Sequence, residues 1–289
     1  FGSSYYIEQS TFAPGLIKKL RKERPDIVHL QDPRLAWLLE KAYRQGKHFS
    51  KVIFAHGTGE DMEFRQRFQC LQELSPYYLN QVLDSRQNET GKMLFAIPNF
   101  VDTDTFKPIK NCENITGTRR KYGIPADAFV VGSVGAVRKG HKRMDYLIKE
   151  FGQFLTNFKS SKIKVEKEPF LLIVGATEDQ SRDVIDLAKS NIPEVQFQIL
   201  LDIPADKMPE LYHAMDVFAL CSLEEIFGIC FLEAMASGVP CIGHKYPVTE
   251  WIIGDALASP VNDYSLLVNS ENFNNQEPVT DNCAGGVCI

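Results

Sequence analysis

The chain has 289 residues, which is enough for one large or two ordinary domains. Hydrophobic residues make up 44% of it and charged residues 24%, as in ordinary soluble proteins, and the formal net charge of −5 argues against a nucleic-acid-binding protein. No apolar run approaches the roughly 20 residues that span a bilayer. The seven cysteines include no C-x-x-C pair typical of zinc or redox sites. A reducing, cytoplasmic location is therefore expected.

The first predicted helix covers residues 14–24 and follows a stretch, 1–12, without clear periodicity. One side of this helix is apolar and the other is basic, with Lys18, Lys19, Arg21 and Lys22. Two interpretations stay open. The basic side is either a solvated helix face or a contact with an anionic membrane surface, which would make the protein membrane-peripheral.

Strands and helices then alternate. Strands are predicted at 27–30, 51–55 and 93–97, and helices at 32–46, 60–70 and 75–83. This order predicts a parallel α/β domain over residues 1–107. Residues 107–125 resemble a loop, so the domain boundary is placed near residue 107.

A second α/β series follows. Its predicted strands are 129–135, 170–174, 195–200, 217–220 and 239–242, and its predicted helices are 144–158, 182–189, 208–215 and 249–253. The second domain therefore covers residues 108–260. Residues 261–289 are rich in Asn and Ser without a sustained period, and they predict an irregular tail.

The run 224–238 carries the main chemical signal. It lies between two apolar strands and places Glu225 in a loop, Phe227 and Gly228 at the start of a helix, and Glu233 within that helix. A glycine lets the backbone approach a ligand closely, and the N–H groups of a helix start favour an anion. The arrangement suits an anionic centre flanked by hydroxyl groups, as in a sugar nucleotide.

The pattern E-x-F-G-x4-E-A-M-A-x-G-x-P at 225–240 resembles the retaining glycosyltransferases of the GT-B fold, family 4. Segments 24–29, 97–108 and 209–217 support the resemblance, which covers about residues 24–255. The family implies an α/β fold of two Rossmann-like domains whose parallel sheets face a cleft, with the sugar nucleotide in that cleft. The family's opening strand and Gly-rich loop are not seen. The N-terminal domain is therefore expected to be incomplete, either as a fragment or in a reduced family member.

By position, the resemblance implies that Glu225 binds hydroxyls of the transferred sugar and that Glu233 binds the ribose diol. The backbone N–H groups of Phe227, Gly228 and Ile229 would face the sugar and the diphosphate. The alternative for Glu233 is an exposed helix carboxylate with no ligand.

A basic loop follows the strand that ends at Gly135, and the family places cations there to stabilise the diphosphate leaving group without a metal ion. The expected lysine is Lys142, but Ala136 stands where the family has an arginine. Three neighbouring cations are candidates to replace it: Arg138, Lys139 and Arg143. The alternative is a solvated basic loop.

Three further positions follow from the resemblance. His56, at the end of a strand, would point towards the transferred sugar; the alternative is a histidine bonded to backbone. Leu201 and Ile203 would border the nucleobase, whose identity the sequence does not give. The D-x-D pair Asp102 and Asp104 is interpreted as a cap, and no metal is assigned.

The expected function is the retaining transfer of a sugar from a nucleotide-diphosphate sugar to an acceptor, which would be a glycan, a lipid or a small molecule. No cofactor or nucleic-acid partner is expected. Two alternatives remain. One is a non-catalytic subunit that binds a sugar nucleotide. The other is a GT-B epimerase or phosphorylase, although the E-x-F-G run argues against that class.

Overall fold

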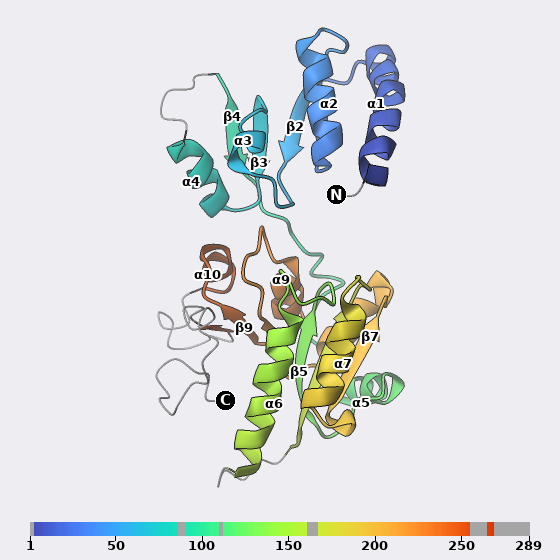
Figure 1. Ribbon diagram of the computed structural model, residues 1–289, viewed down its shortest axis with the longest axis vertical. Helices are drawn as coiled ribbons and strands as arrows, with labels where there is room; N and C mark the ends of the chain where they lie inside the picture. Colours follow the sequence, from blue (N-terminus) through green and yellow to red (C-terminus); the bar gives the residue numbers. More distant parts are fainter. Residues whose placement is uncertain (1–2, 86–90, 110–111, 161–166, 255–264, 269–289) are drawn as a thin grey trace. The chain divides into compact units, whose positions relative to one another are not determined.

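The computed structural model describes residues 3–85, 91–109, 112–160, 167–254 and 265–268. It divides the chain into two units, Phe1–Asn99 and Phe100–Ile289 (Figure 1). Each unit has a parallel sheet of its own.

The first unit is built around four strands. Its elements in chain order are α1 (Ser3–Glu23), β1 (Ile27–Leu30), α2 (Pro33–Arg44), β2 (Lys51–Ala55), α3 (Met62–Arg65), β3 (Cys70–Glu73), α4 (Pro76–Asp84) and β4 (Met93–Ala96). The sheet has the order β1-β2-β3-β4, and all its pairs are parallel. Each strand is joined to the next through a helix, because parallel neighbours need a crossover connection. This confirms the predicted α/β class.

Apolar side chains hold these elements together in two groups. Leu20 of α1 and Leu39 of α2 pack with Val52 of β2. Phe54 of β2 packs against Phe68, with ring centroids 4.5 Å apart.

Two sequence predictions for this unit are wrong in their bounds, and one strand was missed. The first helix begins at Ser3 rather than at residue 14, and its early turns are anchored by Tyr5, whose hydroxyl donates to Asp32 Oδ1 at 3.0 Å. Only α3 is helical within 60–70. Strand β3 was not predicted, because Gln72 and Glu73 look exposed in sequence although all four β3 residues are buried.

The second unit is built around six strands. Its elements in chain order are α5 (Cys112–Lys121), β5 (Phe129–Val134), α6 (Met144–Ser160), β6 (Pro169–Gly175), α7 (Ser181–Asn191), β7 (Phe197–Leu201), α8 (Met208–His213), β8 (Val217–Leu220), α9 (Ile229–Ala236), β9 (Cys241–His244), α10 (Pro247–Ile253) and β10 (Ser265–Val268). The parallel sheet has the order β10-β9-β8-β5-β6-β7. The chain runs from β5 outwards to β7 and then returns to β8 on the other side of β5. Strands β5 and β8 therefore form a topological switch point, where open α/β sheets bind ligands at the carboxyl ends of the strands.

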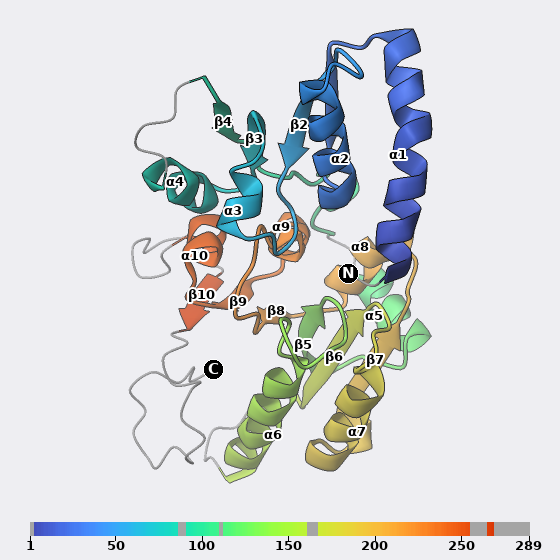
Figure 2. The ribbon, with the colours of Figure 1, turned by 45° about the horizontal axis from the view of Figure 1, so that its top comes forward.

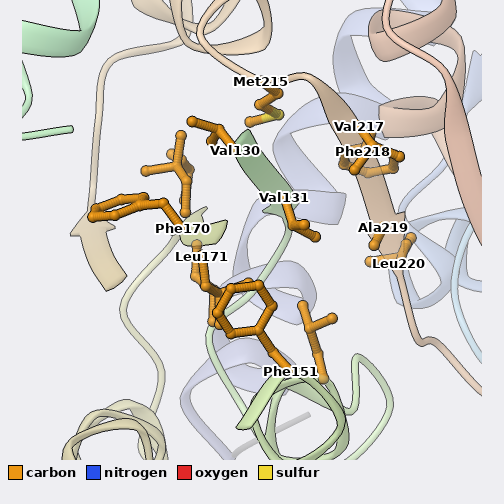
Figure 3. Close-up of a cluster of buried hydrophobic side chains, with 14 of the residues drawn as sticks. Val130, Val131, Phe151, Phe170, Leu171, Met215, Val217, Phe218, Ala219 and Leu220 are labelled. Atoms are coloured by element: carbon orange, nitrogen blue, oxygen red, sulfur yellow. The ribbon is translucent and has the colours of Figure 1, made fainter. Parts of the chain in front are cut away.

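Helices cover both faces of this sheet. Helices α6 and α7 lie together on one face, and α8, α9 and α10 lie on the other (Figures 1 and 2). This division follows from right-handed crossovers, because the chain moves in opposite directions before and after the switch point. In Figure 3, Phe151 of α6 lies against the sheet beside Leu171 of β6. Burial of each such side chain contributes roughly 1.5–3 kcal/mol.

The unit boundary lies between Asn99 and Phe100, whereas the sequence places it near residue 107. The segment after Asn99 belongs to the second unit through two contacts with α8. The ring of Phe106 lies 5.9 Å from that of Tyr212, and His213 Nε2 donates to the Lys107 carbonyl at 2.7 Å.

Two elements of the second unit were also missed. Helix α5 lies in the predicted loop 107–125, and it is held by buried Arg119, which bonds Ala214 O at 3.0 Å and Asp216 Oδ2 at 2.7 Å. Strand β10 lies in the predicted irregular tail and pairs in parallel with β9. The rest of that tail, 261–264 and 269–289, lies outside the described residues.

A close backbone contact shapes the loop after β5. A Cβ atom on Gly175 would lie 1.6 Å from the Gly135 carbonyl oxygen. Gly175→Ala is therefore expected to lower the free energy of unfolding by about 1–3 kcal/mol or more, because backbone must move. Urea unfolding followed by circular dichroism measures this. Gly117→Ala is the control, because its Cβ would meet open space within α5. Equal stability of both variants would contradict the contact.

Candidate functional site

The start of α9 is shaped by Phe227 and Gly228. Gly228 has φ 74°, in the left-handed region that favours glycine, and no side chain caps the first turn of the helix. Phe227 is buried and packs against Trp251, with ring centroids 6.2 Å apart. The turn therefore places Glu225 beside the start of the helix, and a Cβ on Gly228 would lie 3.6 Å from Glu225 Cγ.

Glu225 and Lys142 form an ion pair at the switch point. Lys142 Nζ lies 2.6 Å from Glu225 Oε1, and the two side chains are only 17% and 7% exposed. Lys142 comes from the loop after β5 and Glu225 from the loop after β8, the two adjacent strands where the chain reverses direction. The Lys142 stem runs over Gly135, where a Cβ would lie 3.5 Å from Lys142 Cδ. The structure thus brings together three residues that the sequence singled out: Gly135, Lys142 and Glu225.

His141, next to Lys142, was not assigned a role. Burial lowers the pKa of its imidazole, and the positive charge of Lys142 lowers it further. This shift favours the neutral form of the ring beside Lys142.

Glu233 lies one to two turns into α9 and is half-buried. The hydroxyl of Tyr212 on α8 donates to Glu233 Oε2 at 2.6 Å. Burial raises the pKa of the Glu233 carboxyl, and the hydrogen bond from Tyr212 opposes that shift. Glu233 is thus half-buried and not exposed as the alternative holds, and its contact with the ribose stays a prediction. Sequence reasoning missed Tyr212, because a tyrosine on a short apolar helix looks like an ordinary core residue.

The neighbouring cations are engaged in different ways. Lys139 Nζ pairs with Asp183 Oδ2 of α7 at 2.9 Å, and its backbone N–H donates to Gln180 Oε1. Arg143 pairs with Asp145 Oδ1 at 3.3 Å. Lys139 is thus directed towards α7, and its predicted phosphate role gains no support from this geometry.

Arg138 lines a pocket of about 340 Å³ with His141 and the polar residues that precede α7. Its Nε atom is buried and has no hydrogen-bond partner within the part of the chain that the structure describes. Arg138 therefore stays the candidate for the arginine that Ala136 replaces.

The segment predicted to border the nucleobase is a turn after β7. Asp202 has φ 54°, and its carboxylate accepts from the Thr177 backbone N–H at 2.9 Å and from the Thr177 hydroxyl at 2.6 Å. These bonds lower the pKa of Asp202 and tie the ends of β6 and β7 together. Leu201 and Ile203 on either side are half-buried against the core. The base contact stays a prediction.

Asp102 closes a turn and does not cap a helix, because among the described residues no helix follows it before α5, so the predicted cap is wrong. Its Oδ1 accepts from the Asp104 N–H at 2.9 Å and its Oδ2 from the Thr105 hydroxyl at 2.7 Å. Over the described ranges, no group of three or more His, Cys, Asp or Glu side chains is arranged to hold a metal ion.

His56 of the first unit is bonded to a carboxylate, not to backbone as the alternative holds. Its Nδ1 lies 2.7 Å from Glu73 Oε2, and Arg65 Nη1 donates to Glu73 Oε1 at 3.0 Å. His56 Nε2 is buried, lies 3.8 Å from Glu60 Oε2, and has no hydrogen-bond partner among the described residues. Glu73 fixes one ring nitrogen, the other faces Glu60, and the contact of His56 with the sugar stays a prediction.

The structure of the basic helix α1 does not decide between a solvated face and a membrane contact. Lys18, Arg21 and Lys22 line a shallow pocket with Pro14 and Ile17, and Lys19 lies 3.9 Å from Glu23. Among the described residues, no helix has both the length and the hydrophobicity of a transmembrane segment. The membrane contact stays a prediction.

Comparison with known proteins gives the same assignment as the motif. The family model for glycosyl transferases group 1 matches residues 114–263, more than half of the chain. A relative from Bacillus anthracis, N-acetyl-alpha-D-glucosaminyl L-malate synthase, is 28% identical over 240 residues, which cover 78% of this chain and 58% of the relative. The chain thus spans little more than half of that relative's length.

Solved structures share the fold. Sucrose-phosphate synthase from Thermosynechococcus elongatus has a TM-score of 0.71 at 17% identity, covering 93% of this chain and 67% of that protein. HepE of Anabaena, solved in complex with UDP-glucose, has a TM-score of 0.69 at 15% identity, covering 89% of this chain and 68% of that one. The predicted fold, GT-B with two Rossmann-like units, is confirmed by this likeness. From the family match, the chain belongs to the glycosyl transferases group 1 family.

Proposed function

We propose that this protein transfers a sugar from a nucleotide-diphosphate sugar to an acceptor hydroxyl with retention at the anomeric carbon. The observation that carries the proposal is the largely buried Lys142–Glu225 pair at the switch point of the second sheet, 2.6 Å between Nζ and Oε1. A cation and a carboxylate held together beside an uncapped helix start suit the two halves of such a donor.

Each group has a distinct task in this proposal. Lys142 and the N–H groups at the start of α9 face the diphosphate. Glu225 accepts hydrogen bonds from hydroxyls of the transferred sugar, and Glu233 accepts from the ribose. Arrival of the diphosphate gives Lys142 a second anionic partner besides Glu225. No metal ion is assigned a part.

The proposed reaction needs no side-chain nucleophile. The bond between the anomeric carbon and the diphosphate oxygen breaks, and the acceptor oxygen bonds to the same face of that carbon. The acceptor proton passes to the leaving phosphate oxygen. The fixed charge of Lys142 stabilises the negative charge that develops on the diphosphate, and it does so without reorganisation.

The acceptor would be a glycan, a lipid or a small molecule. For a lipid acceptor, the basic side chains of α1 favour contact with an anionic surface, with each lysine or arginine near the surface contributing about 1 kcal/mol. By the family resemblance, His56 would contact the transferred sugar.

Calorimetry with UDP, ADP and GDP tests donor binding directly. We expect saturable one-to-one binding of at least one of them, with UDP tested first because HepE was solved with UDP-glucose. The corresponding sugar nucleotide should then release its diphosphate, with the sugar recovered on an acceptor or on water. Binding without release would favour the non-catalytic alternative, and an isomerised sugar without acceptor the epimerase. Binding of none of the three would overturn the proposal.

A further inference from the structure

Tyr212 is in an unusual position for a tyrosine hydroxyl. The residue is fully buried, yet its hydroxyl lies 2.6 Å from the carboxylate of Glu233 on the neighbouring helix. Aromatic rings on two sides fix the side chain, because its ring centroid lies 5.9 Å from that of Phe106 and 6.0 Å from that of Phe218. The hydroxyl is therefore held rigidly at one place.

The hydrogen bond leaves most of the Glu233 carboxylate available. Within the described part of the chain, Tyr212 is the hydrogen-bond partner of this carboxylate, and it occupies a single position on Oε2. An ionised carboxylate has about four acceptor positions, so Oε1 and the second lone pair of Oε2 stay open. Two adjacent hydroxyl groups of a ribose need two such positions on one carboxylate.

We propose that Tyr212 is a positioning residue for ribose recognition: its hydroxyl fixes the rotamer of Glu233 so that the remaining acceptor positions meet both ribose hydroxyls. The inference rests on the proposed function, in which Glu233 binds the ribose of the donor. Two opposing effects on the pKa of the Glu233 carboxyl are consistent with this positioning role. Burial raises the pKa of Glu233, and the bond from Tyr212 lowers it, which favours the ionised acceptor.

The variant Tyr212→Phe removes only the hydroxyl and keeps the ring that packs the core. We expect UDP binding, measured by calorimetry on the full chain, to weaken about five- to tenfold. The matched control is Tyr122→Phe. Tyr122 also donates its hydroxyl to a glutamate, Glu210 of α8, at 2.6 Å, but this bond does not involve Glu233. The control should bind UDP as the wild type does.

A ligand without ribose hydroxyls separates positioning from structure. With 2′,3′-dideoxyuridine diphosphate, Tyr212→Phe and the wild type should bind equally, because Glu233 has nothing to contact. Glu233→Asp gives a second test that leaves the buried ring untouched. The shorter aspartate side chain cannot bond the Tyr212 hydroxyl and the ribose hydroxyls at the same time, so UDP binding should weaken by a similar factor. Adding Tyr212→Phe to Glu233→Asp should weaken UDP binding little further.

The outcomes are distinguishable. Equal UDP affinity of Tyr212→Phe and wild type overturns the inference and leaves the proposed function standing. The same loss with UDP and with the dideoxy probe shows a purely structural role and also overturns it. If the wild type binds ADP or GDP instead, that nucleotide and its dideoxy form replace UDP. If it binds none of them, the proposed function and this inference fail together.

Discussion

Lys142→Met is expected to lower the rate of sugar transfer by about 10²–10³-fold, the usual loss when one fixed electrostatic partner of a transition state is removed. Methionine keeps an unbranched apolar stem that can pass over Gly135 but lacks the terminal ammonium group and its charge. Negative charge grows on the diphosphate as the bond to the sugar breaks. The loss should therefore appear in kcat as well as in kcat/KM.

The control for this variant is Lys121→Met. Lys121 also pairs with a glutamate at 2.6 Å, but its partner is Glu210, and the two side chains, on α5 and α8, are 51% and 32% exposed. Transfer by Lys121→Met should equal that of the wild type. Initial rates of nucleotide release at saturating donor make the comparison, with far-ultraviolet circular dichroism to show that both variants are folded. Wild-type turnover by Lys142→Met would remove the leaving-group role from this residue.

The donor side of the fold was largely predictable from sequence, because its signals are local. Strand β8, the turn at Phe227 and Gly228, and helix α9 follow one another within 217–236, and each has its own pattern of apolar and small residues. Family likeness then placed Lys142 near Glu225, although 83 residues separate them. The sheet order explains why this works, since the two loops follow adjacent parallel strands.

The missed features depend on contacts that no local pattern shows. Helix α5 is polar and contains a glycine, so propensity alone argues against it, but Arg119 anchors its end through buried bonds to Ala214 and Asp216. Strand β3 was missed for a similar reason. Glu73 is fully buried because His56 and Arg65 each bond one of its carboxylate oxygens, and neither partner is close in sequence. Tyr212 was overlooked for the same reason, because its hydrogen-bond partner, Glu233, lies 21 residues away in sequence.

Glu225→Gln should separate sugar recognition from nucleotide recognition. The amide keeps the shape of the side chain but loses the charge that strengthens hydrogen bonds to sugar hydroxyls. Misplacing the transferred sugar by about 1 Å costs roughly 10²-fold in rate, so transfer should fall by ~10²-fold. Binding of UDP without a sugar should not weaken, because in the proposed arrangement Glu225 faces the sugar and not the nucleotide. Lys142, which now pairs with Glu225, would then be released to face the phosphates.

The effects on UDP binding and on transfer together distinguish the role of Lys142 from that of Glu225. Lys142→Met should weaken UDP binding and slow transfer, whereas Glu225→Gln should slow transfer alone. The double variant should transfer more slowly than either single variant, because Lys142 acts on the diphosphate and Glu225 on the sugar, with any departure from additivity measuring the coupling through their ion pair. Glu210→Gln, which alters the exposed pair with Lys121, serves as the control and should leave both measurements unchanged. A Glu225→Gln protein that loses UDP affinity as strongly as it loses turnover would place this carboxylate on the nucleotide rather than on the sugar.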